Sequence, residues 1–168
     1  MTRFNKLLVV GLLVGFIAET YALDESEFKI STFDEIIKSN GVSLQDKAAL
    51  PNTFAESPTN PGFSVIVKYQ GKSRDLSQPI KMFFQIPSQA MAARKEFFAN
   101  YTKEILVSEN KINYWIPIQK QVFPFIEKEV KRGEAIKILI RYYGTLVGKS
   151  AKHSSPIFLM MDFEKPNR

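Results

Sequence analysis

The chain has no cysteine and only one histidine, and these two shortages limit the covalent cross-links and metal sites that it can form. Without cysteine there is no disulfide framework and no thiol for lipid attachment. A zinc site needs several cysteine, histidine or carboxylate ligands that converge, whereas His153 stands alone in a basic, hydroxyl-rich segment. We therefore expect neither a metal nor a cofactor.

Long apolar runs are also scarce, and the one candidate lies near the N-terminus. Leu7–Ala18 is an apolar run of 12 residues that follows Arg3 and Lys6, and small residues occupy positions −3 and −1 in Thr20-Tyr21-Ala22. This pattern predicts a secretory signal peptide over residues 1–22, cleaved after Ala22. An uncleaved anchor is the alternative, but the run is shorter than the ~20 apolar residues that cross a bilayer. We expect no transmembrane anchor after cleavage.

Residues 23–168 are long enough to bury one hydrophobic core. We expect an N-terminal helical and loop region over 23–62 and a β-rich α+β region over 63–168, both in one globular unit. An exported domain without disulfides fits the bacterial periplasm better than a eukaryotic secretome, where small domains are stapled by disulfides, and we expect a periplasmic or secreted protein. Loss of the signal peptide leaves 21 basic and 16 acidic residues, a net charge of +5. This modest, dispersed charge favours anionic ligands or acidic protein surfaces and does not single out nucleic acid.

A capping box marks the first predicted helix. In Thr32-Phe33-Asp34-Glu35 the threonine hydroxyl can accept from the Glu35 N–H while the Glu35 carboxylate accepts from the Thr32 N–H. Ile36 then extends the apolar face that starts at Phe33, and Gly41 suits the residue that closes a helix. The segment 52–62, rich in proline and asparagine, predicts a loop.

Period-2 alternation predicts two strands next, at Phe63–Gln70 and Ile80–Ile86, joined as a hairpin by a polar turn. The apolar face of the first strand consists of Phe63, Val65, Val67 and Tyr69. Further elements follow in order along the chain: a helix from Pro87 that fades near Glu104, a strand at Ile105–Val107, a turn at Glu109-Asn110-Lys111, a strand at Tyr114–Ile116 and a helix from Pro124 to Gly133. Pro124 places that last helix start, because proline is favourable only in the first turn.

Two strongly apolar strands end the chain, at Ile136–Tyr143 and Ile157–Phe163. One face of the first strand consists of Ile136, Ile138, Ile140 and Tyr142. Ile157, Leu159, Met161 and Phe163 predict the core-facing side of the last strand, yet Phe158 and Met160 make its other side apolar as well. A sheet with one solvated face would alternate more cleanly. We therefore predict that these strands are central and covered on both sides.

The predicted fold class is α+β, with an antiparallel sheet and two or three packed helices. The order of elements resembles an oligonucleotide/oligosaccharide-binding (OB) barrel, a partly open barrel whose third and fourth strands are separated by a helix. The extra helix after the second predicted strand departs from that plan. A plain sandwich of helices on one antiparallel sheet explains the same order.

Catalytic patterns are weak throughout, and we predict no catalytic residue. There is no Gly-x-Ser-x-Gly elbow beside His153 and no phosphate-binding loop. Three carboxylate pairs occur, at Asp34/Glu35, Glu127/Glu129 and Asp162/Glu164, and we interpret them as solvated or capping groups.

Basic residues interleaved with aromatic ones are the remaining functional pattern. The candidate binding residues are Tyr114, Trp115, Lys137, Arg141 and Tyr143, because aromatic faces and cations together bind sugars and anionic groups. The competing interpretation places Trp115 in the core and the two cations on a solvated strand face. A binding site would then be confined to the rim of the core.

Three functions follow from these patterns. The first is a binding or accessory module of the bacterial envelope without catalytic machinery, whose ligand is anionic or a saccharide, or whose partner is an acidic protein surface. The second is an interaction protein that docks through a sheet edge or an apolar patch over Phe83, Phe158 and Met160. The third is a cofactor-free hydrolase in which carboxylates such as Asp75 and Asp162 converge in a cleft.

Overall fold

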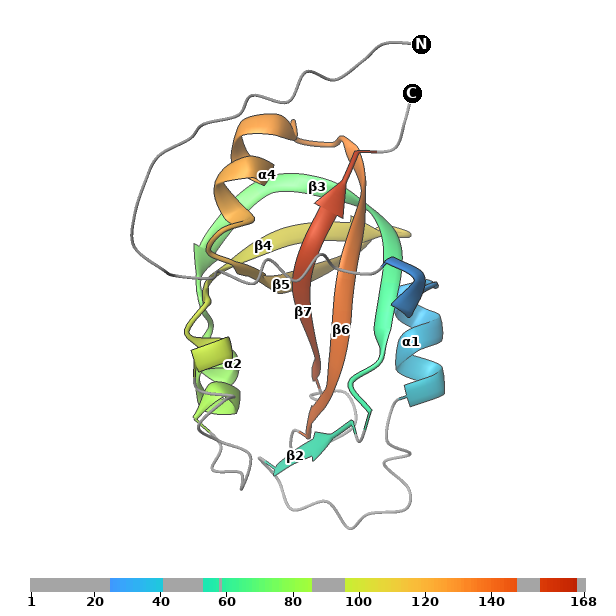
Figure 1. Ribbon diagram of the computed structural model, residues 1–168, viewed down its shortest axis with the longest axis vertical. Helices are drawn as coiled ribbons and strands as arrows, with labels where there is room; N and C mark the ends of the chain where they lie inside the picture. The colour runs from blue at the N-terminus through green and yellow to red at the C-terminus, as the bar shows by residue number, and fades with distance from the viewer. Residues whose placement is uncertain (1–24, 41–52, 58, 86–95, 148–154, 166–168) are drawn as a thin grey trace, which may run out of the picture.

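The computed structural model describes residues 25–40, 53–57, 59–85, 96–147 and 155–165 (Figure 1). The fold is α+β, as predicted. Its elements are a 3-10 helix η1 at Glu25–Glu27, β1 at Phe28–Ile30, α1 at Phe33–Asn40, β2 at Thr53–Glu56, β3 at Gly62–Asp75, α2 at Gln78–Phe84, β4 at Tyr101–Glu109, β5 at Ile112–Gln119, α4 at Phe123–Glu129, β6 at Ala135–Val147 and β7 at Ser155–Glu164. No helix within these ranges is both long enough and apolar enough to cross a membrane.

The strands form a partly closed ring rather than a flat sheet. Their order is β1-β3-β4-β5-β7-β6-β2, and β3 also pairs with β6, so that β3, β4, β5, β7 and β6 close on themselves. The long strand β3 makes this possible, because its first half pairs with β6 and its second half with β4. Figure 1 shows β3 curving over one end of the molecule. The sheet is mixed, since β1 is parallel to β3 and β5 is parallel to β7, and the expectation of a purely antiparallel sheet is wrong.

The ring is weakest between β5 and β7. These two parallel strands share a single registered pair, Ile118 with Met160, whereas β4 and β5 pair along their whole length. On the N-terminal side of Ile118 and Met160 the two strands are no longer paired. This opening positions the candidate site described below.

The main core fills the inside of the ring with the alternating residues of its strands. The inward set on β3 is Phe63, Val65, Val67 and Tyr69, and on β6 it is Ile136, Ile138, Ile140 and Tyr142. Both sets were predicted by alternation. Helix α1 adds Phe33 and Ile36, and α4 adds Ile126, each of them fully buried.

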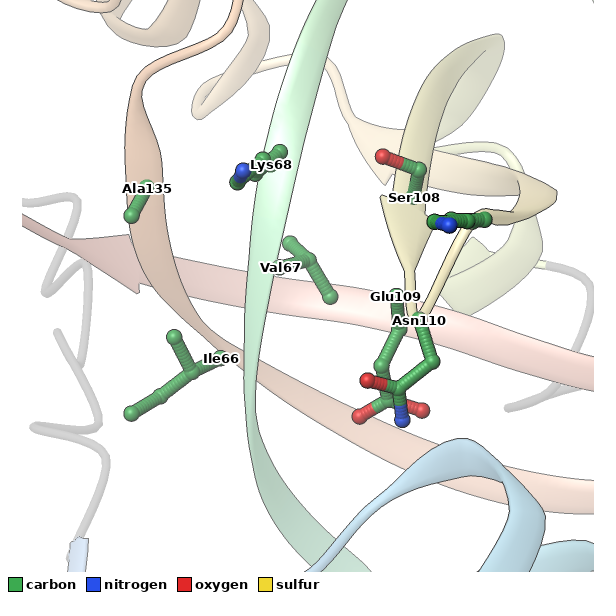
Figure 2. Close-up of a pocket in the computed structure, with 8 residues that line it drawn as sticks. Ile66, Val67, Lys68, Ser108, Glu109, Asn110 and Ala135 are labelled. Atoms are coloured by element: carbon green, nitrogen blue, oxygen red, sulfur yellow. The ribbon is translucent and has the colours of Figure 1, made fainter.

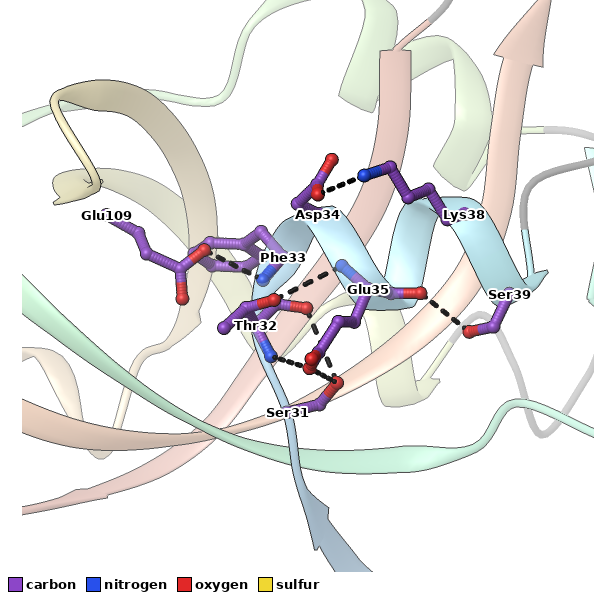
Figure 3. Close-up of polar contacts among 8 residues, drawn as sticks. All are labelled: Ser31, Thr32, Phe33, Asp34, Glu35, Lys38, Ser39 and Glu109. Carbon is purple, nitrogen blue, oxygen red and sulfur yellow. Dashed lines mark hydrogen bonds and ion pairs between the residues drawn. The ribbon is translucent and has the colours of Figure 1, made fainter.

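Helix α1 begins as predicted. Glu35 N–H donates to Thr32 Oγ1 at 3.2 Å, and Thr32 N–H donates to Glu35 Oε2 at 3.0 Å, which completes the capping box (Figure 3). Glu109, at the end of β4, accepts the Phe33 N–H at 2.9 Å. A carboxylate at a helix N-terminus complements the positive end of the helix dipole. The predicted end of this helix, at Gly41, lies outside the described residues.

A second apolar cluster covers the outside of β7. Ile157 and Leu159 point into it, whereas Phe158 and Met160 belong to the main core. The last two strands are thus buried on both sides, as predicted. The presumed core face of Ile157, Leu159 and Met161 instead lies toward the outer cluster, because alternation shows which residues share a face but not which of two apolar faces meets the main core. A bulge at Met161, which has no partner on β6, places Phe163 on the main-core side.

The predicted strand at Ile80–Ile86 is wrong in its described part. Residues 78–84 form α2, with Pro79 in the first turn, where proline is favourable. Its buried residues, Ile80 and Phe83, are three positions apart, which is helical spacing. A short apolar run fits either period, and proline and tertiary packing decide between them. There is consequently no hairpin between β3 and residues 80–86.

Other boundaries differ in smaller ways. β2 at Thr53–Glu56 pairs with β6 in a segment predicted as loop. The predicted helix after Pro87 falls mostly outside the described residues, and the chain is already extended at Tyr101 rather than helical to Glu104. Helix α4 contains Pro124 in its first turn as predicted, but it ends at Glu129, before Gly133. The strands at 105–107 and 114–116 and the turn between them are confirmed.

Candidate ligand-binding site

A cavity of about 380 Å3 lies where β5 and β7 separate. Its wall includes the start of each strand together with residues of α1, α2 and the end of β3. The lining residues are Ile37, Arg74, Ser77, Pro79, Ile80, Glu104, Asn113, Tyr114, Trp115, Leu146, Ser155, Pro156, Ile157 and Phe158. Tyr114 and Trp115 thus face Ser155–Phe158 across the opening.

Arg74 is the only cation in this lining, and it lies over the only tryptophan of the chain. Its guanidinium carbon is 4.0 Å from the centroid of the Trp115 ring. A cation over an indole face is stabilised by about 0.5–2 kcal/mol, depending on how much water is excluded. The Arg74 side chain is 42% exposed, so it remains accessible from the cavity.

Glu104 fixes the position of this guanidinium. Glu104 is 1% exposed, and its carboxylate accepts the Arg74 Nε–H at 3.0 Å, the Ser77 N–H at 2.8 Å and the Ser77 hydroxyl at 3.3 Å. Arg74 and Glu104 are cross-strand partners on β3 and β4. A buried carboxylate with three donors has its hydrogen-bonding needs satisfied. The same group also ties the start of α2, at Ser77, to the ring.

The terminal nitrogens of Arg74 remain available. Within the described part of the chain, the guanidinium has one hydrogen bond, through Nε to Glu104. Arginine presents its donors in a planar fork that matches a carboxylate or phosphate. The Arg74 side chain is therefore held at one edge, stacked on one face and free to bind an anion through its terminal donors.

Two of the five predicted binding residues lie at this cavity, on opposite faces of β5. Trp115 is on the outer face with Arg74, whereas Tyr114 packs toward the core, with its ring centroid 4.2 Å from that of Phe33. Burial raises the pKa of the Tyr114 phenol, with a smaller contribution from the Glu109 carboxylate. Tyr114 is thus a neutral part of the wall.

The other three predicted residues, all on β6, lie elsewhere. Lys137 forms an ion pair with Glu164 at 2.6 Å, and Arg141 forms one with Glu27 at 3.0 Å. Tyr143 packs against the outer apolar cluster. The five residues therefore do not form one surface, because β7 lies between β5 and β6 in the ring.

Sequence reasoning missed Arg74 and Glu104. Arg74 fell in a predicted turn and Glu104 at the fading end of a predicted helix, so neither had an assigned face. The two residues are separated by 30 positions in the sequence, so neither helical nor strand periodicity relates them. Only the antiparallel register of β3 and β4 places them opposite one another.

The carboxylate and apolar-patch hypotheses find no support at their named residues. Asp75 forms an ion pair with Lys103 at 2.7 Å, which holds the pKa of Asp75 below its ordinary value, and neither Asp75 nor Asp162 lines the cavity. The patch residues Phe83, Phe158 and Met160 are all buried. His153 lies outside the described residues. Among the described residues, no three metal-ligating side chains are grouped closely enough to hold an ion.

A second cavity, of about 500 Å3, lies beside the turn that joins β4 and β5 (Figure 2). Its lining includes Ile66, Lys68, Ser108, Glu109 and Asn110. This lining contains no aromatic ring, and within the described ranges it forms no ion pair; its one carboxylate already accepts the N–H at the start of α1. The cavity at Arg74 and Trp115 offers the richer chemistry.

Comparison with known proteins adds no further constraint. No protein-family profile matches the chain, and no curated protein matches it significantly. The geometry of the cavity is therefore the basis of the function proposed below.

Proposed function

We propose that this protein is an exported binding module of the bacterial envelope, built on an OB-type barrel, that binds an anionic ligand in the cavity at Arg74 and Trp115. The observation that carries this proposal is the Arg74 guanidinium, stacked on Trp115 and held by the buried Glu104 carboxylate. Rigid, satisfied neighbours orient the cation before any ligand arrives. Less side-chain entropy is then lost on binding.

The topology supports the OB-type assignment. In the ring, β3, β4, β5, β6 and β7 are the first to fifth strands along the chain, and α4 lies between the third and the fourth. The predicted departure from this plan was a helix that followed a second strand at Ile80–Ile86. Because residues 78–84 are helical, that strand does not form in its described part, and β4 is the second ring strand. OB-folds bind their ligands on the face of the second and third strands and at adjacent loops. Glu104 and Trp115 lie on those two strands.

Export is supported by the N-terminal sequence pattern. The basic residues, the apolar run and the small residues before Leu23 together favour secretion and cleavage. Mass spectrometry of the protein recovered from a bacterial periplasm should give a chain that starts at Leu23. A full-length chain retained in the membrane fraction would contradict this part of the proposal.

Trp115 makes the binding proposal directly testable, since it is the only tryptophan. The mature protein is titrated with four sodium salts at constant ionic strength: acetate, glucuronate, phosphate and decanoate. Trp115 fluorescence and calorimetry both report binding. At least one anion should bind, and Arg74→Gln should weaken it at least tenfold.

Arg132→Gln provides the control, because it removes the same charge from an exposed residue outside the cavity lining. This variant should bind as the wild type does. Binding of no anion, or equal losses in Arg74→Gln and Arg132→Gln, would refute the proposed site. Arg74→Lys separates charge from geometry, since lysine keeps the charge but lacks the planar fork.

A further inference from the structure

We infer that the ligand of this cavity is an organic monoanion with an apolar body, of the class of medium-chain or aromatic carboxylates. This inference rests on the proposed function and narrows it, because an anionic sugar or a phosphate would also satisfy the broader proposal. Three properties of the cavity support it: the apolar character of its wall, the small number of free polar groups and its volume.

The wall is mostly apolar. Its accessible apolar side chains are Ile37 on α1, Pro79 on α2, Leu146 on β6 and Pro156 on β7. The buried residues Ile80, Ile157 and Phe158 form the floor beneath them. Such side chains gain stability from an apolar ligand in proportion to the surface removed from water. They offer no hydrogen bond to a ligand hydroxyl, and a hydroxyl buried without a partner is destabilising. A saccharide body is therefore a poor match for this wall.

Few polar groups remain for the ligand. The Ser77 hydroxyl donates a hydrogen bond to the Glu104 carboxylate, and the Arg74 Nε–H donates another to the same carboxylate. Among the described residues, the lining groups that have no hydrogen-bond partner are the terminal nitrogens of Arg74, the Tyr114 hydroxyl, the Trp115 indole N–H and the side chains of Asn113 and Ser155. This set suits one carboxylate. A phosphate dianion fits less well, because Arg74 is the single cation and the Glu104 carboxylate lies beside it.

The volume sets the size of the ligand. A cavity of about 380 Å3 lies at the lower end of the range of about 300–1,000 Å3 that small-molecule sites occupy. Decanoate is a monoanion of about this size with a wholly apolar body. It is the probe that we choose.

The experiment compares decanoate with decanol, which keeps the apolar body and lacks the charge, and with glucuronate, which keeps the carboxylate on a polar body. Calorimetry on the mature protein, below the micelle concentration of the probes, gives each affinity. Decanoate should bind at least tenfold more tightly than either comparator. Arg74→Gln should abolish the preference for decanoate over decanol without changing the affinity for decanol, and Arg132→Gln should leave both affinities unchanged.

A second variant tests the apolar wall. Ile37→Gln places a polar group in the wall and should weaken decanoate and decanol by the same factor; urea denaturation verifies that it is folded. Equal binding of decanol and decanoate to the wild type would overturn the inference. Glucuronate binding that depends on Arg74, without decanoate binding, would also overturn it and leave the proposed function intact. Failure of every anion would overturn both.

Discussion

Phe33→Ala tests whether α1 is part of the cooperative core. Phe33 is fully buried, and its ring centroid lies 4.2 Å from that of Tyr114 and 4.9 Å from that of Phe158. It therefore packs between β5 and β7, on the inner side of the region where these strands separate. If α1 completes the core there, removal of this ring destabilises the whole domain.

The expected loss can be worked out from this burial. Truncation of a buried phenylalanine to alanine costs about 3–5 kcal/mol, since transfer energy is lost and a cavity remains. Domains of this kind are stable by only about 5–15 kcal/mol, so the loss is a large share. With a urea m-value of about 2 kcal/mol/M, the midpoint should fall by about 2 M.

Urea denaturation followed by Trp115 fluorescence and by circular dichroism measures this loss. The control is Ile30→Ala, because Ile30 is 81% exposed and its truncation should change stability by no more than about 0.5 kcal/mol. If α1 only rests on the ring, Phe33→Ala would detach the helix and leave the main transition in place. A midpoint shift no larger than that of Ile30→Ala would refute the reasoning.

Three further predictions concern buried or constrained residues. Glu104→Gln should lower the free energy of unfolding by about 1–3 kcal/mol, because the carboxylate accepts three hydrogen bonds in a buried place, and an unchanged urea midpoint would contradict this. Burial raises the pKa of Glu109 above 4.5, so Glu109→Gln should gain stability relative to the wild type as the pH rises through that region. The backbone hydrogen bond of the capping box lowers the pKa of Glu35, so Glu35→Gln should lose stability relative to the wild type over the same rise in pH. The urea midpoints of the two variants, each relative to the wild type, should therefore change in opposite directions with pH, and changes in the same direction would contradict the prediction. Gly71→Ala should lower the free energy of unfolding by about 1 kcal/mol more than Gly133→Ala, as measured by thermal denaturation. Both glycines have positive φ, but only at Gly71 would the new Cβ lie 3.0 Å from a neighbouring side chain, that of Arg132; an equal loss of stability in the two variants would contradict this packing.

Local signals predicted the elements whose cause is local. The capping box at Thr32 and Glu35 forms because its donors and acceptors are three residues apart. Alternation on β3 and β6 assigned their inward faces correctly, because those faces stay regular where the two strands pair. Pro124 located the start of α4 through the missing N–H of proline.

Predictions failed where packing between distant segments decides the outcome. The run from Ile80 to Phe84 fits a strand or a helix, and the packing of Ile80 and Phe83 in the outer cluster corresponds to the helix. Both faces of β7 are apolar, so the sequence does not show which one meets the main core, and the bulge that moves Phe163 to the core side has no sequence signal. The ring itself depends on β3 pairing with both β4 and β6.

The candidate site divides in the same way. Trp115 could be selected from the sequence, since a lone tryptophan beside a tyrosine in a strand is a visible feature. Its neighbours in the site could not be selected. Lys137, Arg141 and Tyr143 belong to the same pattern of basic and aromatic residues, but they lie on β6, away from Trp115. Arg74 joins Trp115 only through the register of three strands, and the cavity exists only because β5 and β7 separate.

The sequence by itself determined the export signal pattern, the α+β class, the first helix and the apolar character of the last two strands. These properties follow from composition and from contacts between residues a few positions apart. The tertiary structure decided the closure of the ring, the faces of β7 and the meeting of Arg74, Glu104 and Trp115. Each of these depends on strand register, which is set by packing between segments that lie tens of residues apart in the chain.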